Sequence, residues 1–381
     1  MKKTLLAAAL LAGFAGAASA QSSVTLYGIV DGGLRYQQVS RNNLDGTNNV
    51  GLAYGQQSGN RFGMRGVESL GNGNNAIFML ESGFDLGNGT SQQGGRLFGR
   101  QAWMGVENTA WGQVRLGRML NLTTDYLVNV VDPFGAGFGQ LNMGHAFTSG
   151  NTVRIDNTLM YKRPTMSGSQ SGAGYSFATG LTSNGGTTGY GFATSNNSRE
   201  LTVGARYANG PVYVAASYEK AYAATTSAAN GQSVGNWNIA GSYDFKVVKL
   251  AAGYGQTRDG FWAGSGAGGA GAQLGVTPGI GNGGTNALVF APAVGYNSFI
   301  VGATVPVNAT SRVLLSWTMI TPNSNMKDAY NASNQSSYNL GYTYDFTKRT
   351  NLYTYVGQSV NYATVDTAKS TIVGLGMRHA F

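Results

Sequence analysis

The sequence predicts an all-β fold: a transmembrane antiparallel barrel of about sixteen strands, with short periplasmic turns and long external loops. Three observations lead to this class. Apolar and polar residues alternate in many short segments, the connections between them are alternately short and long, and only 11% of the 381 residues are charged. Soluble domains average about 25% charged residues, so we expect much of the outer surface to face lipid.

The first twenty residues have the three parts of a secretory signal. Lys2 and Lys3 form a charged start, residues 5–15 are apolar, and Ala18-Ser19-Ala20 supplies a small-residue cleavage site. The apolar part is too short to span a bilayer as a helix, which takes about twenty residues. We therefore expect residues 1–20 to be removed and residues 21–381 to form a single barrel domain.

Alternation is clearest at residues 337–346, where every second side chain is apolar or aromatic and those between are mostly polar. Residues 236–245 repeat the pattern, and residues 312–319 repeat it less regularly. About sixteen such segments of roughly ten residues can be counted, and this is the length that a tilted strand needs to cross a bilayer. No apolar run of the mature chain reaches about eighteen residues, which argues against membrane-spanning helices.

The connections between these segments fall into two classes. Short ones rich in turn-forming residues lie at residues 71–74, 109–112, 209–210, 307–310 and 347–350. Long ones lie at residues 37–59, 120–152, 183–198, 258–297 and 321–335. This alternation predicts an up-and-down barrel with two different rims, and closure is required because an open sheet edge in lipid leaves backbone groups unpaired.

The connection at residues 120–152 is longer than a loop that only joins two strands of a compact fold, so we expect it to have a function. Asp125 and Asp132 stand here among apolar residues, and Pro133 breaks the run, a mixture suited to folding into the barrel mouth. Asp132 has an alternative interpretation, which is that it caps the turn before Pro133.

Alternation places several charged residues on the lumen side of their strands. A guanidinium facing lipid costs about 2–4 kcal/mol at the midplane, which favours the lumen for Arg61, Arg100 and Arg154. Arg115 and Arg118 fall on opposite faces, so one of them should lie near a rim. The further candidates for lumen charges are Arg65, Arg115, Glu81 and Asp125.

Arginines on one wall facing Asp132 on the other predict a transverse field in a narrow waist. The screening length of about 8 Å at physiological salt is comparable with such a waist, so we expect a moderate preference for anions. The alternative interpretation is that Arg61, Arg100 and Arg154 pair with neighbouring carboxylates such as Glu81 or Asp156 and stiffen the wall. The two roles can coexist.

A set of short motifs runs along the whole mature chain: residues 21–28, Arg61-Phe62-Gly63, Gly66-Val67-Glu68, Arg100-Gln101-Ala102-Trp103, Gly105-Val106, Leu116-Gly117-Arg118, Asp132-Pro133-Phe134-Gly135 and the terminal Phe381. In this combination the chain resembles a Gram-negative general porin, especially the anion-selective beta-proteobacterial type. The resemblance covers the whole mature chain and implies sixteen strands, a homotrimer and a third long loop folded into the lumen.

The resemblance also implies roles for individual residues. Arg61, Arg100 and Arg154 match the basic wall cluster of these porins, and Asp132 lies in the region that carries the facing acids. Ile29 stands where some porins place a lysine. Phe381 resembles the terminal aromatic signal that the barrel-assembly machinery reads, and outer-membrane lipid and lipopolysaccharide are implied as further partners.

We therefore predict passive diffusion of small hydrophilic solutes and ions through the outer membrane of a Gram-negative bacterium. Two alternatives are a channel specific for organic acids and a plugged, adhesin-like barrel. We expect no enzyme, because a hydrolytic site needs a histidine beside an acid and the neighbours of His145 offer none. With no cysteine, two histidines and no basic run, we also expect no metal, no cofactor and no nucleic-acid partner.

Overall fold

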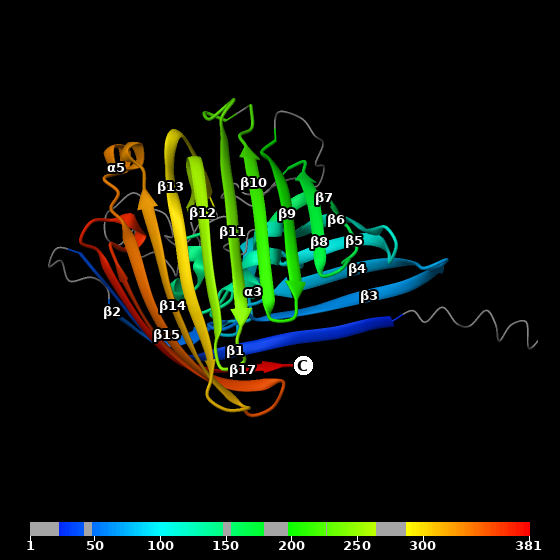
Figure 1. Ribbon diagram of the computed structural model, residues 1–381, viewed down its shortest axis with the longest axis horizontal. Helices are drawn as coiled ribbons and strands as arrows, with labels where there is room; N and C mark the ends of the chain where they lie inside the picture. The colour runs from blue at the N-terminus through cyan, green and yellow to red at the C-terminus, as the bar shows by residue number, and fades with distance from the viewer. Residues whose placement is uncertain (1–22, 42–47, 148–153, 179–196, 226, 264–286) are drawn as a thin grey trace, which may run out of the picture.

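The computed structural model describes residues 23–41, 48–147, 154–178, 197–225, 227–263 and 287–381. These residues form one antiparallel sheet in which strands that follow each other in sequence pair, except that β2 and β3 both pair with β1 (Figure 1). The strands are β1 (Ser23–Ser40), β2 (Asn48–Tyr54), β3 (Arg61–Gly71), β4 (Asn74–Gly83), β5 (Gln101–Asn108), β6 (Gly112–Leu120), β7 (Arg154–Lys162), β8 (Ser169–Ser176), β9 (Arg199–Asn209), β10 (Val212–Tyr222), β11 (Ser233–Asp244), β12 (Lys249–Ala263), β13 (Ala287–Pro306), β14 (Ser311–Pro322), β15 (Gln335–Asp345), β16 (Thr350–Val360) and β17 (Lys369–Ala380).

The sheet closes on itself between its first and last strands. Residues 29–40 of β1 pair with residues 369–380 of β17, and Gly28 and Phe381 exchange two backbone hydrogen bonds of 3.1 and 3.0 Å. The sheet has seventeen labelled strands, but β2 and β3 pair with successive parts of β1. Counting this end-to-end pair as one position gives the predicted sixteen, so the fold class is confirmed.

The two faces of the sheet differ as the alternation predicts. On β15, Asn339 points inward and is 5% exposed, whereas its neighbour Leu340 points outward and is 47% exposed. Trp237, Ile239 and Tyr243 of β11 are exposed on the same outer face. The outer surface of the barrel is therefore apolar and aromatic, as contact with lipid requires.

The short turns lie where the sequence predicts them, but two of the long connections are shorter than expected. The end of β1 and the whole of β2 occupy much of residues 37–59, and β12 and β13 extend into the connection predicted at 258–297. These strands project beyond the length needed to cross the bilayer, and so their sequence carries no strong apolar alternation. Within the described residues, no helix has the length and hydropathy needed to cross a membrane.

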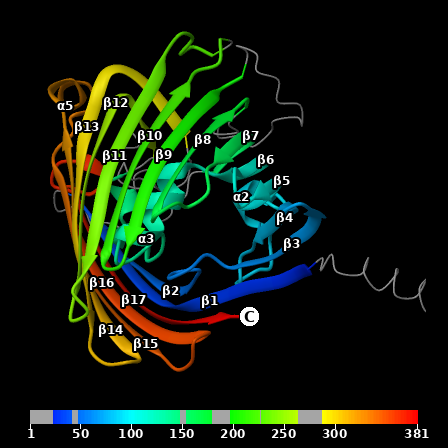
Figure 2. The same ribbon diagram turned by 45° about the vertical axis from the view of Figure 1, so that its right-hand side comes forward.

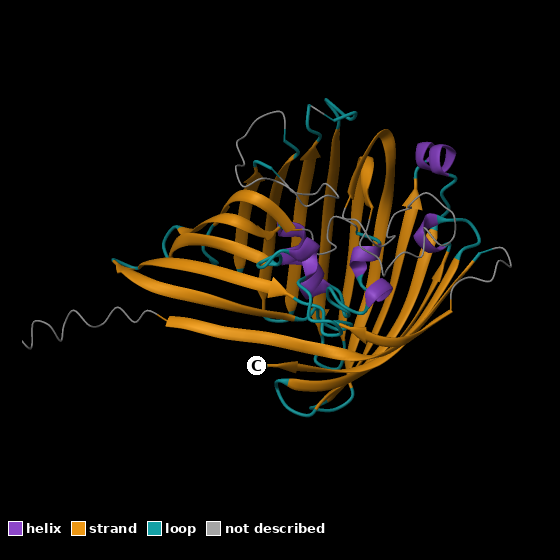
Figure 3. Ribbon diagram, turned by 180° about the vertical axis from the view of Figure 1, so that it is seen from behind, coloured by secondary structure: helices purple, strands orange, loops and turns teal. Residues whose placement is uncertain are grey.

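The helical segments are short and lie mostly in the connections. They are α2 (Gln92–Gly95), η2 (Thr124–Val128), α3 (Asn129–Val131), η3 (Gly139–Leu141), η4 (Met143–His145), α5 (Ser324–Tyr330) and η6 (Tyr362–Thr364). Residues 121–147, which contain η2, α3, η3 and η4, lie inside the ring of strands (Figures 2 and 3). We call this segment the inward loop, and its position confirms the predicted third loop in the lumen.

Apolar side chains fix the inward loop to the inner wall in three places. The first cluster packs on inward side chains of β10, β11 and β12 and consists of Leu122, Tyr126, Leu127 and Val131. The second packs on β13 and consists of Val128, Met143 and Phe147. The third packs on Tyr353 and Tyr355 and consists of Phe134, Phe138 and Leu141. Full burial of one large apolar side chain contributes about 1.5–3 kcal/mol, so the loop is held firmly. This apolar inner wall explains the unusual apolar content of the loop sequence.

A buried polar contact also holds the start of the inward loop. The backbone N–H and the hydroxyl of Thr123 donate to Glu219 Oε1 on β10 at 3.0 and 2.7 Å. The hydroxyl of Thr202 on β9 donates to the same oxygen at 2.9 Å. These contacts fix the point at which the chain leaves the wall and enters the lumen.

Candidate functional site: the narrowed lumen

The inward loop leaves a cavity of about 590 Å³ between itself and the wall formed by β1, β3 to β7 and β17. The wall side carries all the charged groups that border this cavity among the described residues, namely Arg61, Glu81, Arg100, Arg154 and Arg378. The loop side is made of residues 136–145 and Thr124. We call this cavity the waist.

The three predicted arginines come together in the waist from the ends of separate strands. Arg61 begins β3, Arg100 precedes β5, and Arg154 begins β7. The side chain of Arg61 is fixed through its Nε, which donates to the Gly59 carbonyl at 2.9 Å. Because each position is a strand terminus beside the inward loop, the closed sheet brings the three side chains to one height.

Glu81 links one of these arginines to the wall. Its Oε1 lies 2.7 Å from Arg100 Nε, and its Oε2 accepts the hydroxyl of Tyr27 at 3.0 Å. The pairing that the sequence offered as an alternative is therefore present for Arg100, which also borders the lumen. Arg100 therefore both pairs with a wall carboxylate and faces the lumen.

The charge around the waist is unbalanced. Four arginines and one glutamate border it among the described residues, and the loop segment 136–145 contains no carboxylate. The loop presents instead amide, imidazole and backbone groups, with Asn142 and His145 as its polar side chains. The waist thus has one cationic wall and one neutral wall.

Asp132 does not lie in the waist. Its side chain is 6% exposed, its Oδ1 accepts the backbone N–H of Phe134 at 2.9 Å, and its Oδ2 accepts that of Met143. Burial raises the pKa of this carboxyl to about 7, and the two N–H donors act in the opposite direction. Asp132 thus caps the turn before Pro133, as the alternative interpretation predicted. It does not face the arginines across the waist, as the first interpretation expected.

The other predicted lumen charges lie nearer the turn-bearing end. Asp125 of the inward loop forms an ion pair with Lys162, and the guanidinium of Arg115 lies 4.2 Å from the ring centroid of Trp103. Arg65 is exposed and lies 6.0 Å from the ring of Tyr27. None of these three charged residues borders the waist, whereas Glu81 does.

A β-bulge corrects one expectation drawn from strict alternation. The pairing of β6 with β7 shifts between Gly117 and Met119, and Gly117 has a φ of +132°. The extra residue turns Arg118 inward, where it forms an ion pair with Asp156, so Arg115 and Arg118 share a face. Trp103 of β5 also lies inside, where it is 8% exposed and contacts Arg115.

The sequence analysis missed a carboxylate that shapes the waist. Asp31 of β1 accepts the backbone N–H groups of Gln56, Gln57 and Ser58 at 3.1, 3.0 and 2.8 Å, and the hydroxyl of Tyr353 at 2.6 Å. These bonds hold residues 55–60, which link β2 to β3 and border the waist. No local motif marks Asp31, because its partners lie far away in the sequence.

Arg378 was also missed, although a signal was present. Val373, Leu375 and Met377 of β17 are exposed on the outer face, so alternation places Arg378 inside. Its Nε donates to Ser58 Oγ at 3.0 Å. The residues held by Asp31 therefore also position this fourth arginine.

Comparisons with known proteins agree with this architecture. Residues 7–364 match the model of the Gram-negative porin family. The chain is 45% identical over 400 aligned positions to an outer membrane porin protein of Bordetella pertussis, with 100% of both chains covered. It is 29% identical to outer membrane porin protein 32 of Delftia acidovorans, over 93% of this chain and 88% of that one. Among solved structures, the anion-selective porin from Comamonas acidovorans is similar, with a TM-score of 0.70, 25% identity and coverage of 95% of this chain and 100% of that one.

Proposed function

The chain belongs to the Gram-negative porin family and is an outer-membrane channel, and we propose that the arginines of its waist give that channel a preference for small anions. The observation that carries this proposal is the imbalance of charge: four arginines against one glutamate, opposite a loop segment without carboxylates. Unit charges about 4 Å apart interact by about 1 kcal/mol even in bulk water. Several arginines around one cavity therefore favour entry of an anion over entry of a cation.

The neutral loop wall changes the mechanism expected from the sequence. With Asp132 buried, the field in the waist comes from the arginines and Glu81, and not from opposite charges on facing walls. A small anion is held near the cationic wall, while the amides and backbone of the loop replace part of its hydration. The similar porin from Comamonas acidovorans is described as anion-selective, which supports the same preference here.

Several further assignments rest on the family. We propose a homotrimer in outer-membrane lipid and lipopolysaccharide, and a role for Phe381 as the signal for the barrel-assembly machinery. Phe381 ends the chain at the closure of the barrel and is 50% exposed, which suits a residue that a partner reads. We propose no catalytic role, since the family and fold are those of channels.

Replacing the three predicted arginines tests the proposal. In planar bilayers with a salt gradient, the Arg61→Gln/Arg100→Gln/Arg154→Gln variant should lose most of the anion preference measured as the zero-current potential. Arg349→Gln removes one charge from an exposed turn outside the waist and should leave that potential unchanged. An unchanged anion preference in the triple variant would remove these residues from the mechanism. A wild-type protein that shows no steady open steps would favour the alternative of a plugged, adhesin-like barrel.

A further inference from the structure

A second cavity, of about 630 Å³, lies on the side of the inward loop that faces the short turns. Loop residues 132–136 and Phe138 border it on one side, and turn residues 309–310 and 345–348 border it on the other. Cavities that hold small ligands measure about 300–1,000 Å³. This turn-side cavity is therefore large enough for a small solute.

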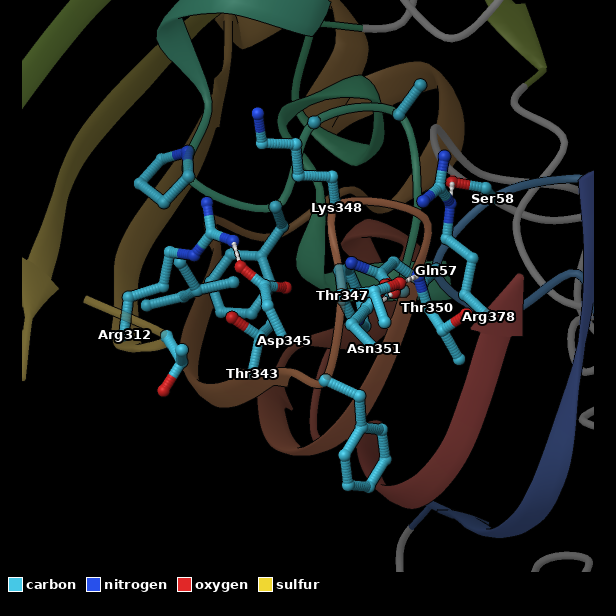
Figure 4. Close-up of a pocket in the computed structure, with 18 of the residues that line it drawn as sticks. Gln57, Ser58, Arg312, Thr343, Asp345, Thr347, Lys348, Thr350, Asn351 and Arg378 are labelled. Carbon is cyan, nitrogen blue, oxygen red and sulfur yellow. Dashed lines mark hydrogen bonds and ion pairs between the residues drawn. The ribbon is translucent and has the colours of Figure 1, made fainter. Parts of the chain in front are cut away.

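The turn-side cavity carries positive charge that carboxylates only partly balance. Arg312 forms an ion pair with Asp345, and Figure 4 shows this pair on the opposite side of the cavity from Arg378. Among the described residues, no carboxylate lies within 4.0 Å of the nitrogens of Lys348 or Arg378. Asp132 also borders the cavity, but both of its oxygens already accept backbone N–H groups.

Neutral donors line the same cavity. Thr343 is 4% exposed, and its Oγ1 has no hydrogen-bond partner among the residues that the structure places. Ser58 accepts a hydrogen bond from Arg378, which leaves the hydrogen of its own hydroxyl available to an acceptor. The cavity thus holds, besides the pair of Arg312 and Asp345, two cations and two hydroxyls that can donate to an oxyanion.

The turn-side cavity adjoins the waist. Gln57, Ser58 and Arg378 border both cavities. An anion that moves from the waist toward the short turns therefore passes Arg378, which borders both cavities, and enters the cavity that Lys348 borders. The basic path extends beyond the waist toward the periplasmic rim.

We propose that this cavity is an anion subsite in which Lys348 and Arg378 bind a small divalent oxyanion on the periplasmic side of the inward loop. The proposal rests on the channel function above and extends it, because selection then takes place at two successive positions. A divalent anion bound there delays the passage of chloride. The delay is expected to depend on Lys348, which plays no part in the waist.

Sulfate block of the chloride current tests the subsite in single channels. Each unit of charge on an anion about 4 Å from a cation counts for about a factor of five in water, and sulfate carries two, so Lys348→Gln should raise the half-blocking sulfate concentration about twenty-five-fold. Arg349→Gln is the matched control, since it lies in the same turn but does not border the cavity. Thr343→Val, which keeps the charge and removes the hydroxyl, should raise the concentration by a smaller factor.

The results separate the subsite from the channel. Equal sulfate block in wild type and Lys348→Gln, or an equal rise in Arg349→Gln, overturns the subsite while the zero-current potential in chloride alone still reports the anion preference. A wild-type channel without anion preference overturns the proposed function instead. Lys348 is exposed in a turn, so its replacement is expected to leave the barrel folded.

Discussion

Replacing Asp31 by asparagine should loosen the wall segment that positions Arg61 and Arg378. The carboxylate accepts four hydrogen bonds, two on each oxygen. An asparagine amide keeps only one oxygen. An NH₂ group at the Oδ2 position faces two backbone N–H donors and loses both bonds, whereas one at the Oδ1 position loses the bond to Gln56 and can donate to the Tyr353 hydroxyl. Hydrogen bonds to a charged group contribute about 1.5–3 kcal/mol each, and relief of the buried charge offsets part of this loss, so we expect about 3 kcal/mol of destabilisation.

The expected effect of Asp31→Asn can be measured in two ways. Urea titration of the barrel refolded in lipid vesicles gives the free energy of unfolding, and single-channel recordings should show added current noise from the released residues 55–60. The matched control is Asp244→Asn, because Asp244 lies in an exposed turn and its Oδ1 accepts the N–H of Lys246 at 2.7 Å. If Asp31→Asn is no more destabilising than Asp244→Asn and shows no more current noise, then Asp31 does not hold residues 55–60 in the way assigned to it.

Three further changes have defined outcomes. Burial raises the pKa of the Asp132 carboxyl from 3.8 to about 7, so between these pH values the folded barrel holds a proton that the unfolded chain has lost. The free energy of unfolding should therefore fall, by up to about 4 kcal/mol, as the pH rises from about 4 to 7. Urea titrations at several pH values should show this fall in the wild type and not in Asp132→Asn. Glu81→Gln removes the negative charge of the waist and should shift the zero-current potential toward stronger anion preference, and a shift toward cations would contradict the charge argument. Deleting Phe381 removes two backbone hydrogen bonds at the closure of the barrel. If the assembly machinery reads this residue, the amount of barrel assembled in the outer membrane should fall more than the yield of refolding in detergent. Equal losses in both would exclude a recognition role.

The fold was predictable because a barrel in lipid has a two-residue period that every strand must obey. The same period identified Arg61, Arg100 and Arg154, which stand at strand ends where the lumen is narrow. It failed at Gly117, where one extra residue reverses the faces, since a bulge leaves no mark in the order of polar and apolar residues.

The inward loop was predictable in position but not in detail. Its mixture of acidic and apolar residues indicated folding into the barrel mouth, and the structure places it inside the ring of strands with its apolar side chains packed on the inner wall. The direction of Asp132 was not predictable, because an irregular loop has no period from which to read the side that a carboxylate faces. Asp31 was missed for a related reason: Tyr353 and residues 56–58 reach it only after the barrel has closed.

The zero-current potential of the wild-type channel in a potassium chloride gradient tests the central claim most directly. A waist with one cationic wall and one neutral wall predicts steady open steps and a potential of the sign set by chloride, and lowering the salt concentration should strengthen this preference because screening weakens. A potential of the sign set by potassium, or one that stays near zero at low salt, would contradict the account.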